Sequence, residues 1–184
     1  MPPARRRDAE RNRNRLLAVA AEVVAERGPE APLSEISSRA GVGAGTLYRH
    51  FPTRESLLVA LFDARVDELC AAAVRAGDTH RPAVALRAWM LQFVRHALTD
   101  NGLAETIDLT RGSADHDCAA RIEAAAAQLL DAAQQAGVVT ATVDAGQLIR
   151  LCIALALAAD DLDQAASLIA IAWSGLAASP LPRG

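Results

Sequence analysis

The stretch LSEISSRAGVGAGTLYRHF, residues 33–51, decides how the rest of the chain is interpreted. Apolar residues recur in it at helical spacing, the glycine-containing turn 41–43 interrupts them, and a second short helix is expected from Ala44 to His50. Leu47 and Phe51 stand four residues apart, so both would pack this second helix against the first. Two short helices joined by a tight glycine turn are the sequence form of a helix-turn-helix.

The opposite side of the second short helix is expected to be bare. It carries four residues at i, i+1, i+4 and i+5: Ala44, Gly45, Tyr48 and Arg49. Small residues at a helix N-terminus allow close approach to base edges in a major groove about 12 Å wide. Thr46 and His50 lie beside this face, and Arg54 lies in the first turn of the next helix, where each could donate to phosphate oxygens. The pattern therefore predicts a surface that binds DNA.

The composition predicts an all-α chain. Among the 184 residues, 42 are alanine, 52% are apolar and only 3% are aromatic. The expected helices besides the two short ones cover residues up to Arg27, then about 54–76, 82–100, 103–109, 118–136, 145–158 and 162–177. Pro82 and Asp144 begin two of them, and residues 77–80 are expected to form a loop. Because the helix over 145–158 is apolar nearly all round, we expect it to be buried on most sides.

The cysteines and the N-terminus indicate a location. Cys70, Cys118 and Cys152 are widely spaced and form no CxxC pair, which favours a reducing compartment. No apolar stretch follows the basic N-terminus, so no signal peptide is expected. The uncharged segment 164–182 is interrupted by polar residues and rich in alanine, so it is interpreted as a buried helix and not as a membrane span. We expect a cytoplasmic protein with no membrane partner.

Charge is distributed unevenly along the chain. Residues 1–55 hold ten arginines against seven acidic residues, whereas residues 56–184 hold nine arginines against fifteen. Residues 1–15 alone have six arginines and two acidic residues. A basic arm on an otherwise acidic protein suggests an anionic partner at one end, although a solvated, disordered tail would have the same composition. The helix-turn-helix pattern behind the arm favours the anionic partner.

The run GVGAGTLYRHFPTRESLL, residues 41–58, resembles the signature of TetR-type transcriptional regulators. The resemblance covers about residues 10–62. It implies a basic arm plus three-helix DNA-binding domain over residues 1–55, joined by the fourth helix to a helical effector-binding and dimerisation domain over residues 56–184. The layout of this second part resembles the C-terminal domain of the branch similar to the nitrogen regulator SbtR.

The resemblance also implies roles for single residues. Positions that usually hold the DNA backbone are matched by Thr46, Tyr48, His50 and Arg54, and positions at or near base edges by Ser34, Ala44, Gly45 and Arg49. Arg39 is counted with the DNA-binding residues, and Arg5, Arg6, Arg7 and Arg11 form an arm that would reach phosphates or the adjacent minor groove. Ala44 stands where lysine is common, and Pro32 where a capping Thr or Ser is frequent, so the operator sequence stays open.

A mechanism follows from this family resemblance. A homodimer would read a palindromic, double-stranded operator with half-sites about 34–36 Å apart. A small-molecule effector bound among the C-terminal helices would tilt the fourth helix and release the DNA, which makes the protein a repressor. The candidate dimer face uses helices 118–136 and 162–177, with Leu129, Leu162, Ile169, Trp173 and Leu176. The candidate effector pocket has Trp89, Met90, Phe93 and His96, although core packing on one helical stripe explains these four residues more simply, and Trp173 could be core as well as an interface anchor.

Other functions are disfavoured by the sequence. Residues 115–118, Asp-His-Asp-Cys, have metal-ligand chemistry, but no second pair stands at ligand spacing, so no metal is expected. Gly43-x-Gly45 is only part of a dinucleotide fingerprint, and no strand precedes it, so no cofactor is expected. The runner-up is a helical small-molecule binding or enzyme scaffold whose helix-turn-helix is only structural. The bare face at 44, 45, 48 and 49 and the basic arm favour the non-enzymatic regulator.

Overall fold

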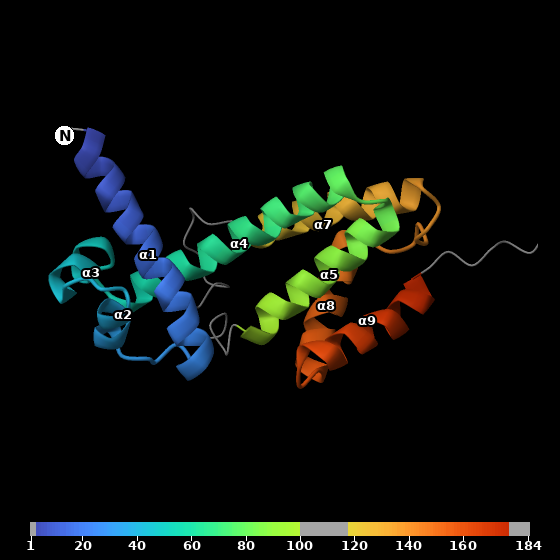
Figure 1. Ribbon diagram of the computed structural model, residues 1–184. Helices are drawn as coiled ribbons and strands as arrows, with labels where there is room; N and C mark the ends of the chain where they lie inside the picture. The colour runs from blue at the N-terminus through green and yellow to red at the C-terminus, as the bar shows by residue number, and fades with distance from the viewer. Residues whose placement is uncertain (1–2, 100–117, 177–184) are drawn as a thin grey trace, which may run out of the picture. The chain divides into compact units, whose positions relative to one another are not determined.

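The computed structural model describes residues 3–99 and 118–176, with side chains from residue 8 onward in the first range. These residues form helices and no strand (Figure 1). The helices are α1 (Pro3–Arg27), α2 (Leu33–Arg39), α3 (Ala44–His50), α4 (Arg54–Thr79), α5 (Pro82–Thr99), α7 (Cys118–Gln135), α8 (Ala145–Ala158) and α9 (Leu162–Leu176). The all-α prediction is confirmed.

The described residues fall into two compact units. Unit one extends to Ala64, and unit two takes Arg65–Thr99 together with residues 118–176. The units divide inside α4, so this helix contributes its first turns to unit one and its remainder to unit two. The domain boundary at 55/56 stays a prediction.

Helix ends follow the signals in the sequence. Gly28 adopts φ +80° directly after α1, a left-handed conformation that glycine reaches without steric cost. Asp144 caps α8 by accepting from the Gln147 backbone N–H at 2.7 Å, while the Gln147 side chain accepts from the Asp144 N–H at 3.0 Å. Such a capping box satisfies two of the donors left free at a helix N-terminus.

The structure also corrects three expectations. The loop expected at 77–80 is largely helical, because α4 continues to Thr79, whose hydroxyl donates to the Arg75 carbonyl at 2.6 Å. The basic arm is not a tail but the beginning of α1, from Pro3 onward. The helix expected at 103–109 and the polar loop after it lie outside the described residues.

The core of unit one joins α1, α2, α3 and the start of α4. Its largest fully buried side chains are Leu16, Val23, Ile36, Leu47, Leu57 and, at 2% exposure or less, Leu61 and Phe51. Leu47 and Phe51 thus occupy the packing positions that their spacing predicts. Burial of several large apolar side chains, each contributing about 1.5–3 kcal/mol, holds the short helices in place.

Unit two is a bundle in which α5 packs against α7, α8 and α9. Trp89 of α5 is fully buried and its indole N–H donates to the Leu69 carbonyl at 3.1 Å, so no polar group is left unpaired there. Its ring lies 5.7 Å from that of Phe93. These contacts fix α5 against the second half of α4.

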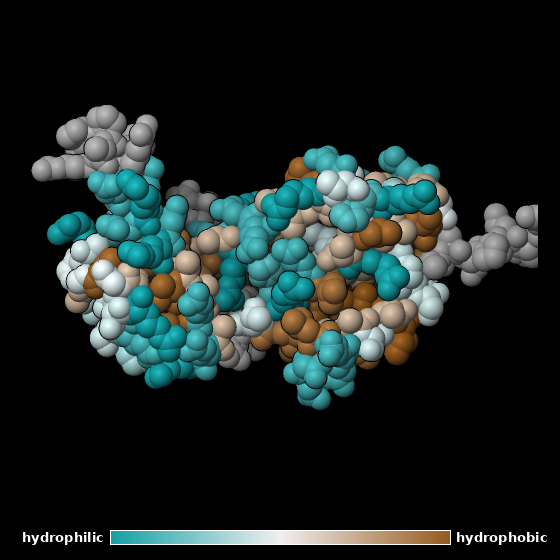
Figure 2. All heavy atoms as spheres, in the orientation of Figure 1, coloured by the Kyte–Doolittle hydropathy of each residue, from teal (hydrophilic) through white to brown (hydrophobic). Residues whose placement is uncertain are grey.

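The third correction is that α8 is buried on one side only. Leu148, Cys152 and Ala156 face the core, but Ile153 is 44% exposed and Leu157 81% exposed. Figure 2 shows hydrophobic residues at the surface over the region that α5, α8 and α9 occupy in Figure 1. The apolar outer side of α8 therefore has no neighbour within the described chain.

Candidate nucleic-acid interface

The turn between α2 and α3 is held by its own backbone. Gly41 adopts φ +65°, and its N–H and that of Val42 donate to the carbonyls of Ser38 and Ser37, each at 3.0 Å. The Ser37 hydroxyl, in a side chain only 6% exposed, donates to the Ser34 carbonyl at 3.0 Å. A residue with a Cβ would be strained at position 41, so glycine there fixes the angle at which α3 leaves α2.

Helix α3 has one buried and one bare side. Leu47 is 0% exposed in the core of unit one, whereas the four residues of the predicted face are all exposed, Tyr48 at 52%. That face consists of Ala44, Gly45, Tyr48 and Arg49. Thr46 and His50 are half-buried beside it, and Ser34 of α2 is exposed. The exposure of the face agrees with its spacing in the sequence, while its contact with DNA stays a prediction.

Gly45 is not required by the packing of the chain. A Cβ built on this residue would meet no atom within 4 Å, and its φ lies outside the left-handed region. Glycine in a helix costs about 0.5–1 kcal/mol relative to alanine. Because the fold gains nothing from glycine at this place, the open first turn of α3 is suited to close approach by a partner.

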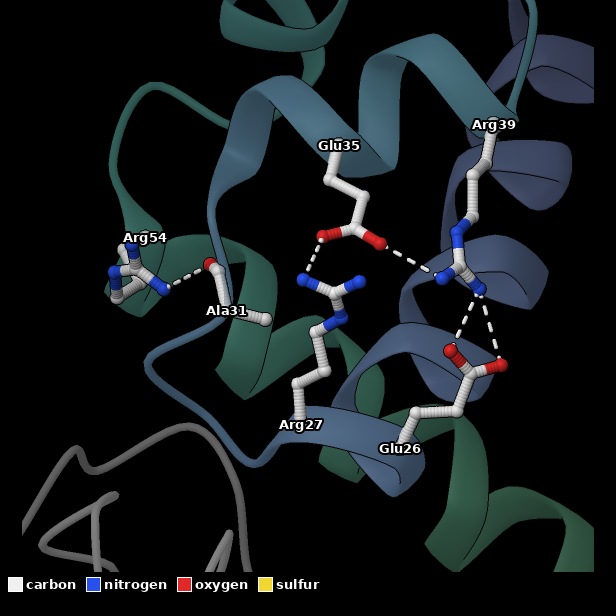
Figure 3. Close-up of polar contacts among 6 residues, drawn as sticks. All are labelled: Glu26, Arg27, Ala31, Glu35, Arg39 and Arg54. Carbon is white, nitrogen blue, oxygen red and sulfur yellow. Dashed lines mark hydrogen bonds and ion pairs between the residues drawn. The ribbon is translucent and has the colours of Figure 1, made fainter.

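Arg39, predicted to contact DNA, is engaged in an ion-pair network (Figure 3). Its guanidinium lies 2.8 Å from a carboxylate oxygen of Glu26 on α1 and 2.7 Å from one of Glu35 on α2. Glu35 also pairs with Arg27 at 3.1 Å. Hydrogen bonding to Glu26 raises the pKa of Arg39 above its usual value. The network ties the end of α1 to α2.

Arg54 likewise has partners within unit one. Its Nη1 donates to the carbonyls of Pro29 at 2.8 Å and of Ala31 at 2.6 Å, and the second of these bonds is drawn in Figure 3. The residue is half-buried. Sequence reasoning missed this contact and the Glu26–Arg39 pair, because each joins residues far apart in the chain. Only the i,i+4 spacing of Glu35 and Arg39 was a readable signal.

The remaining basic residues lie along α1. Arg11 is exposed and pairs with Asp8 at 2.6 Å, and the Arg13 guanidinium lies 5.5 Å from the centre of the Phe51 ring. Arg5, Arg6 and Arg7 lie in the first turns of α1, and their side chains are outside the described part of the structure. The arm thus presents its charge from a helix that also packs against α2.

Two family profiles match the chain. The profile for bacterial regulatory proteins of the tetR family matches residues 16–61, and the profile for the C-terminal domain of SbtR-like transcriptional regulators matches residues 81–178. The chain is similar to the TetR transcriptional regulator SCO0520 from Streptomyces coelicolor, whose crystal structure superposes on it with a TM-score of 0.78. The two sequences are 33% identical, and the match covers 91% of this chain and 99% of the other. The chain belongs to the TetR family of bacterial regulatory proteins.

Further relatives agree with this family. A TetR transcription regulatory protein from Mycobacterium vanbaalenii is 36% identical over 94% of this chain and 98% of its own, with a TM-score of 0.76. The HTH-type transcriptional regulator SAR0097 of Staphylococcus aureus is 37% identical over 68 residues, and the match spans 35% of the length of each protein. The resemblances to TetR-type and SbtR-like regulators are confirmed, and α1–α3 form a TetR-family DNA-binding helix-turn-helix domain. Family membership favours the regulator over the enzyme scaffold.

The predicted effector residues of this TetR-family chain lie inside unit two. Trp89 and Met90 are fully buried and Phe93 is 9% exposed, so all three belong to the core. His96 differs from them, because it is half-buried and its Nε2 is buried without a hydrogen-bond partner among the described residues. Burial lowers the pKa of His96 below its usual value of 6.5. Among the four predicted pocket residues it is the one with an ionisable side chain, and the indole N–H of Trp89 is already bound to Leu69.

The predicted dimer face needs a correction at two positions. Leu129 and Ile169 are 2% and 3% exposed and belong to the core of unit two, so neither can contact a second TetR-family protomer. Trp173 and Leu176 are half-buried, and the Arg87 guanidinium lies 5.5 Å from the Trp173 ring centre. Leu162 is 39% exposed. Amphipathic spacing identified which residues of α7 and α9 are apolar, but it did not identify the side that the bundle covers.

The described residues contain neither a cluster of metal-ligating side chains nor a membrane-spanning helix. Over residues 3–99 and 118–176, no three His, Cys, Asp or Glu side chains gather closely enough to hold a metal ion. Residues 115–117 of the acidic, histidine-containing sequence lie outside these ranges. Among the helices described here, none is long and apolar enough to cross a membrane.

Proposed function

We propose that this TetR-family regulator is a cytoplasmic repressor that binds a palindromic operator as a homodimer and is released by a small-molecule effector. The observation that carries the proposal is the two-sided α3: Leu47 is 0% exposed while Tyr48, the next residue, is 52% exposed. A helix anchored on one side and bare on the other can enter a major groove without unfolding its own domain.

The groups on the bare side suit two kinds of DNA contact. Arg49 is exposed and has the fork of donors that reads guanine edges, while Tyr48 offers a hydroxyl to phosphate oxygens. Gly45 and Ala44 provide no donor side chain, so Arg49, Ser34 and the shape of the DNA carry most of the sequence preference. Phosphate contacts position the protein, and only the base contacts select the operator.

Selection of bound DNA from a random pool, followed by titration of the selected site, tests this interface. Tyr48→Ala should lower affinity for all sequences alike, and Arg49→Ala should change the preferred sequence. Arg75→Ala removes a similarly exposed charge from unit two and serves as the control with unchanged binding. Equal binding by all three variants and the unaltered protein would refute the assignment of α3.

The homodimer is supported by the outer sides of α8 and α9. Four large apolar side chains are exposed on these neighbouring helices: Ile153 at 44%, Leu157 at 81%, Leu162 at 39% and Ile171 at 70%. Ile153 and Leu157 lie one helical turn apart on α8 and form an exposed apolar face, and such surface is characteristic of protein interfaces. A second copy of the same patch would cover it through a two-fold axis, and a two-fold dimer matches a palindromic site.

Release by an effector is supported by the polar character of His96 within an apolar bundle. An effector that hydrogen-bonds to its buried Nε2 would satisfy a group that is otherwise unpaired among the described residues. Such a ligand releases DNA only if it binds the released conformation more tightly than the DNA-bound one. Candidate metabolites can be screened for displacement of the selected operator, and His96→Phe should abolish that displacement while operator binding is retained.

A further inference from the structure

The connection between α1 and α2 contains two backbone carbonyls that a single side chain binds. Nη1 of Arg54 donates to the Pro29 carbonyl at 2.8 Å and to the Ala31 carbonyl at 2.6 Å. Both distances are short, as in charge-assisted hydrogen bonds, which are stronger than neutral ones. The contact spans 25 and 23 residues of sequence, so it joins the first residue of α4 to a distant loop.

This connection has few other means of support. Pro32, at the N-cap of α2, provides no side-chain hydrogen bond, and Pro29 and Pro32 lack a backbone N–H. The Ala31 N–H donates to the Gly28 carbonyl at a long 3.2 Å, and the Pro32 carbonyl accepts from the N–H groups of Glu35 at 3.0 Å and Ile36 at 3.5 Å. The Ala31 side chain is nevertheless 3% exposed, so the loop must hold a defined position against the core.

We infer that Arg54 is a positioning residue that clamps the α1–α2 connection to the N-terminus of α4, and that it is not a ligand of the DNA phosphates. Two of the five guanidinium N–H donors, those of Nη1, are engaged with the two carbonyls, and a phosphate that took these two would leave both carbonyls in need of water. By holding the start of α2, Arg54 fixes the helix that carries Ser34 and the turn that orients α3. The clamp itself does not depend on the proposed function, whereas its role in DNA binding does.

Hydrogen exchange of the free, full-length protein tests the clamp. In Arg54→Met, amides over residues 28–36 should exchange about tenfold faster, because two charge-assisted bonds are lost at a partly exposed site. Arg54→Lys retains a charged donor and should restore part of the protection. Arg49→Met removes an exposed arginine of the same unit and should leave exchange over 28–36 unchanged. If Arg54→Met does not fold, Arg54→Lys tests the clamp instead. The clamp predicts that in Arg54→Lys the amides over residues 28–36, and no others, exchange faster than in the unaltered protein.

The salt dependence of operator binding tests the second half of the inference. A residue that neutralises one phosphate contributes about 0.9 to the slope of log K against log salt concentration. We expect Arg54→Met to lower the affinity with the slope unchanged. A slope reduced by about 0.9, or unaltered exchange over residues 28–36, would overturn the inference. If the protein bound no DNA, the proposed function would fail, and the exchange experiment would still decide whether Arg54 is a clamp.

Discussion

Leu157→Asp should dissociate the proposed homodimer without unfolding the protomer. Leu157 is 81% exposed at the end of α8, so its removal deprives the single chain of little buried surface. Full burial of a leucine side chain contributes about 1.5–3 kcal/mol, and a two-fold interface contains each residue twice. About four fifths of that contribution, counted twice, gives roughly 2–5 kcal/mol, and a carboxylate placed in the interface adds a desolvation cost. The dimer dissociation constant should therefore rise by at least about 50-fold.

Sedimentation velocity over a range of protein concentrations measures that constant directly. Denaturant unfolding of the same samples should show a change within about 0.5 kcal/mol, as for an exposed surface position, once the variant is measured as a monomer. Val84→Asp, at a 51% exposed position on α5, is the matched control and should leave the dimer intact. Leu148→Ala, on the buried side of α8, should instead lower the free energy of unfolding by about 2–5 kcal/mol. An unchanged dissociation constant for Leu157→Asp would refute the α8–α9 interface.

Three further predictions concern single residues. Gly45→Ala should raise the free energy of unfolding by about 0.5–1 kcal/mol, because alanine favours the helix and the new methyl group meets no atom of the chain. The same methyl group stands where DNA would approach, so the variant should bind the operator more weakly. Tighter binding would contradict this prediction. Burial lowers the pKa of His96, so the stability linked to this residue is present above its unfolded pKa of 6.5 and is lost as the pH falls toward the lower folded pKa. Urea unfolding between about pH 5 and pH 8 should show this loss of stability. The His96→Gln variant should not show it. Burial raises the pKa of Cys152 to about 12, so its thiol should remain protonated. Iodoacetamide should therefore alkylate the half-buried Cys70 of the folded protein well before Cys152. Equal alkylation rates would contradict this prediction and show that the bundle opens.

The helices and the two-sided α3 could be predicted because the relevant signals are local. Gly28, Gly41 and Gly137 mark places where the backbone turns left-handed, and Asp144 marks a helix start. Leu47 and Phe51 lie one helical turn apart, so their burial and the exposure of Tyr48 follow from one periodicity.

What the sequence could not provide is the partner of each apolar or charged group. Periodicity shows that α8 is apolar on nearly every side, but not that the chain covers only the side of Leu148. Arg54 stands at a position where a phosphate contact is expected from the family, and its bonds to Pro29 and Ala31 depend on a loop 25 residues earlier. Long-range contacts of this kind depend on the tertiary fold and have no fixed spacing.

The network of Glu26, Arg27, Glu35 and Arg39 has a consequence for how the protein meets DNA. Its two positive and two negative charges cancel, so the C-terminal end of α1 contributes almost no distant electric field. Residues 1–15, by contrast, hold six arginines and two acidic residues, and α1 is an electrically polarised rod. Because a polarised charge distribution orients a charged partner as well as attracting it, we expect encounters with a DNA duplex to begin at the amino end of this helix, before any base contact forms.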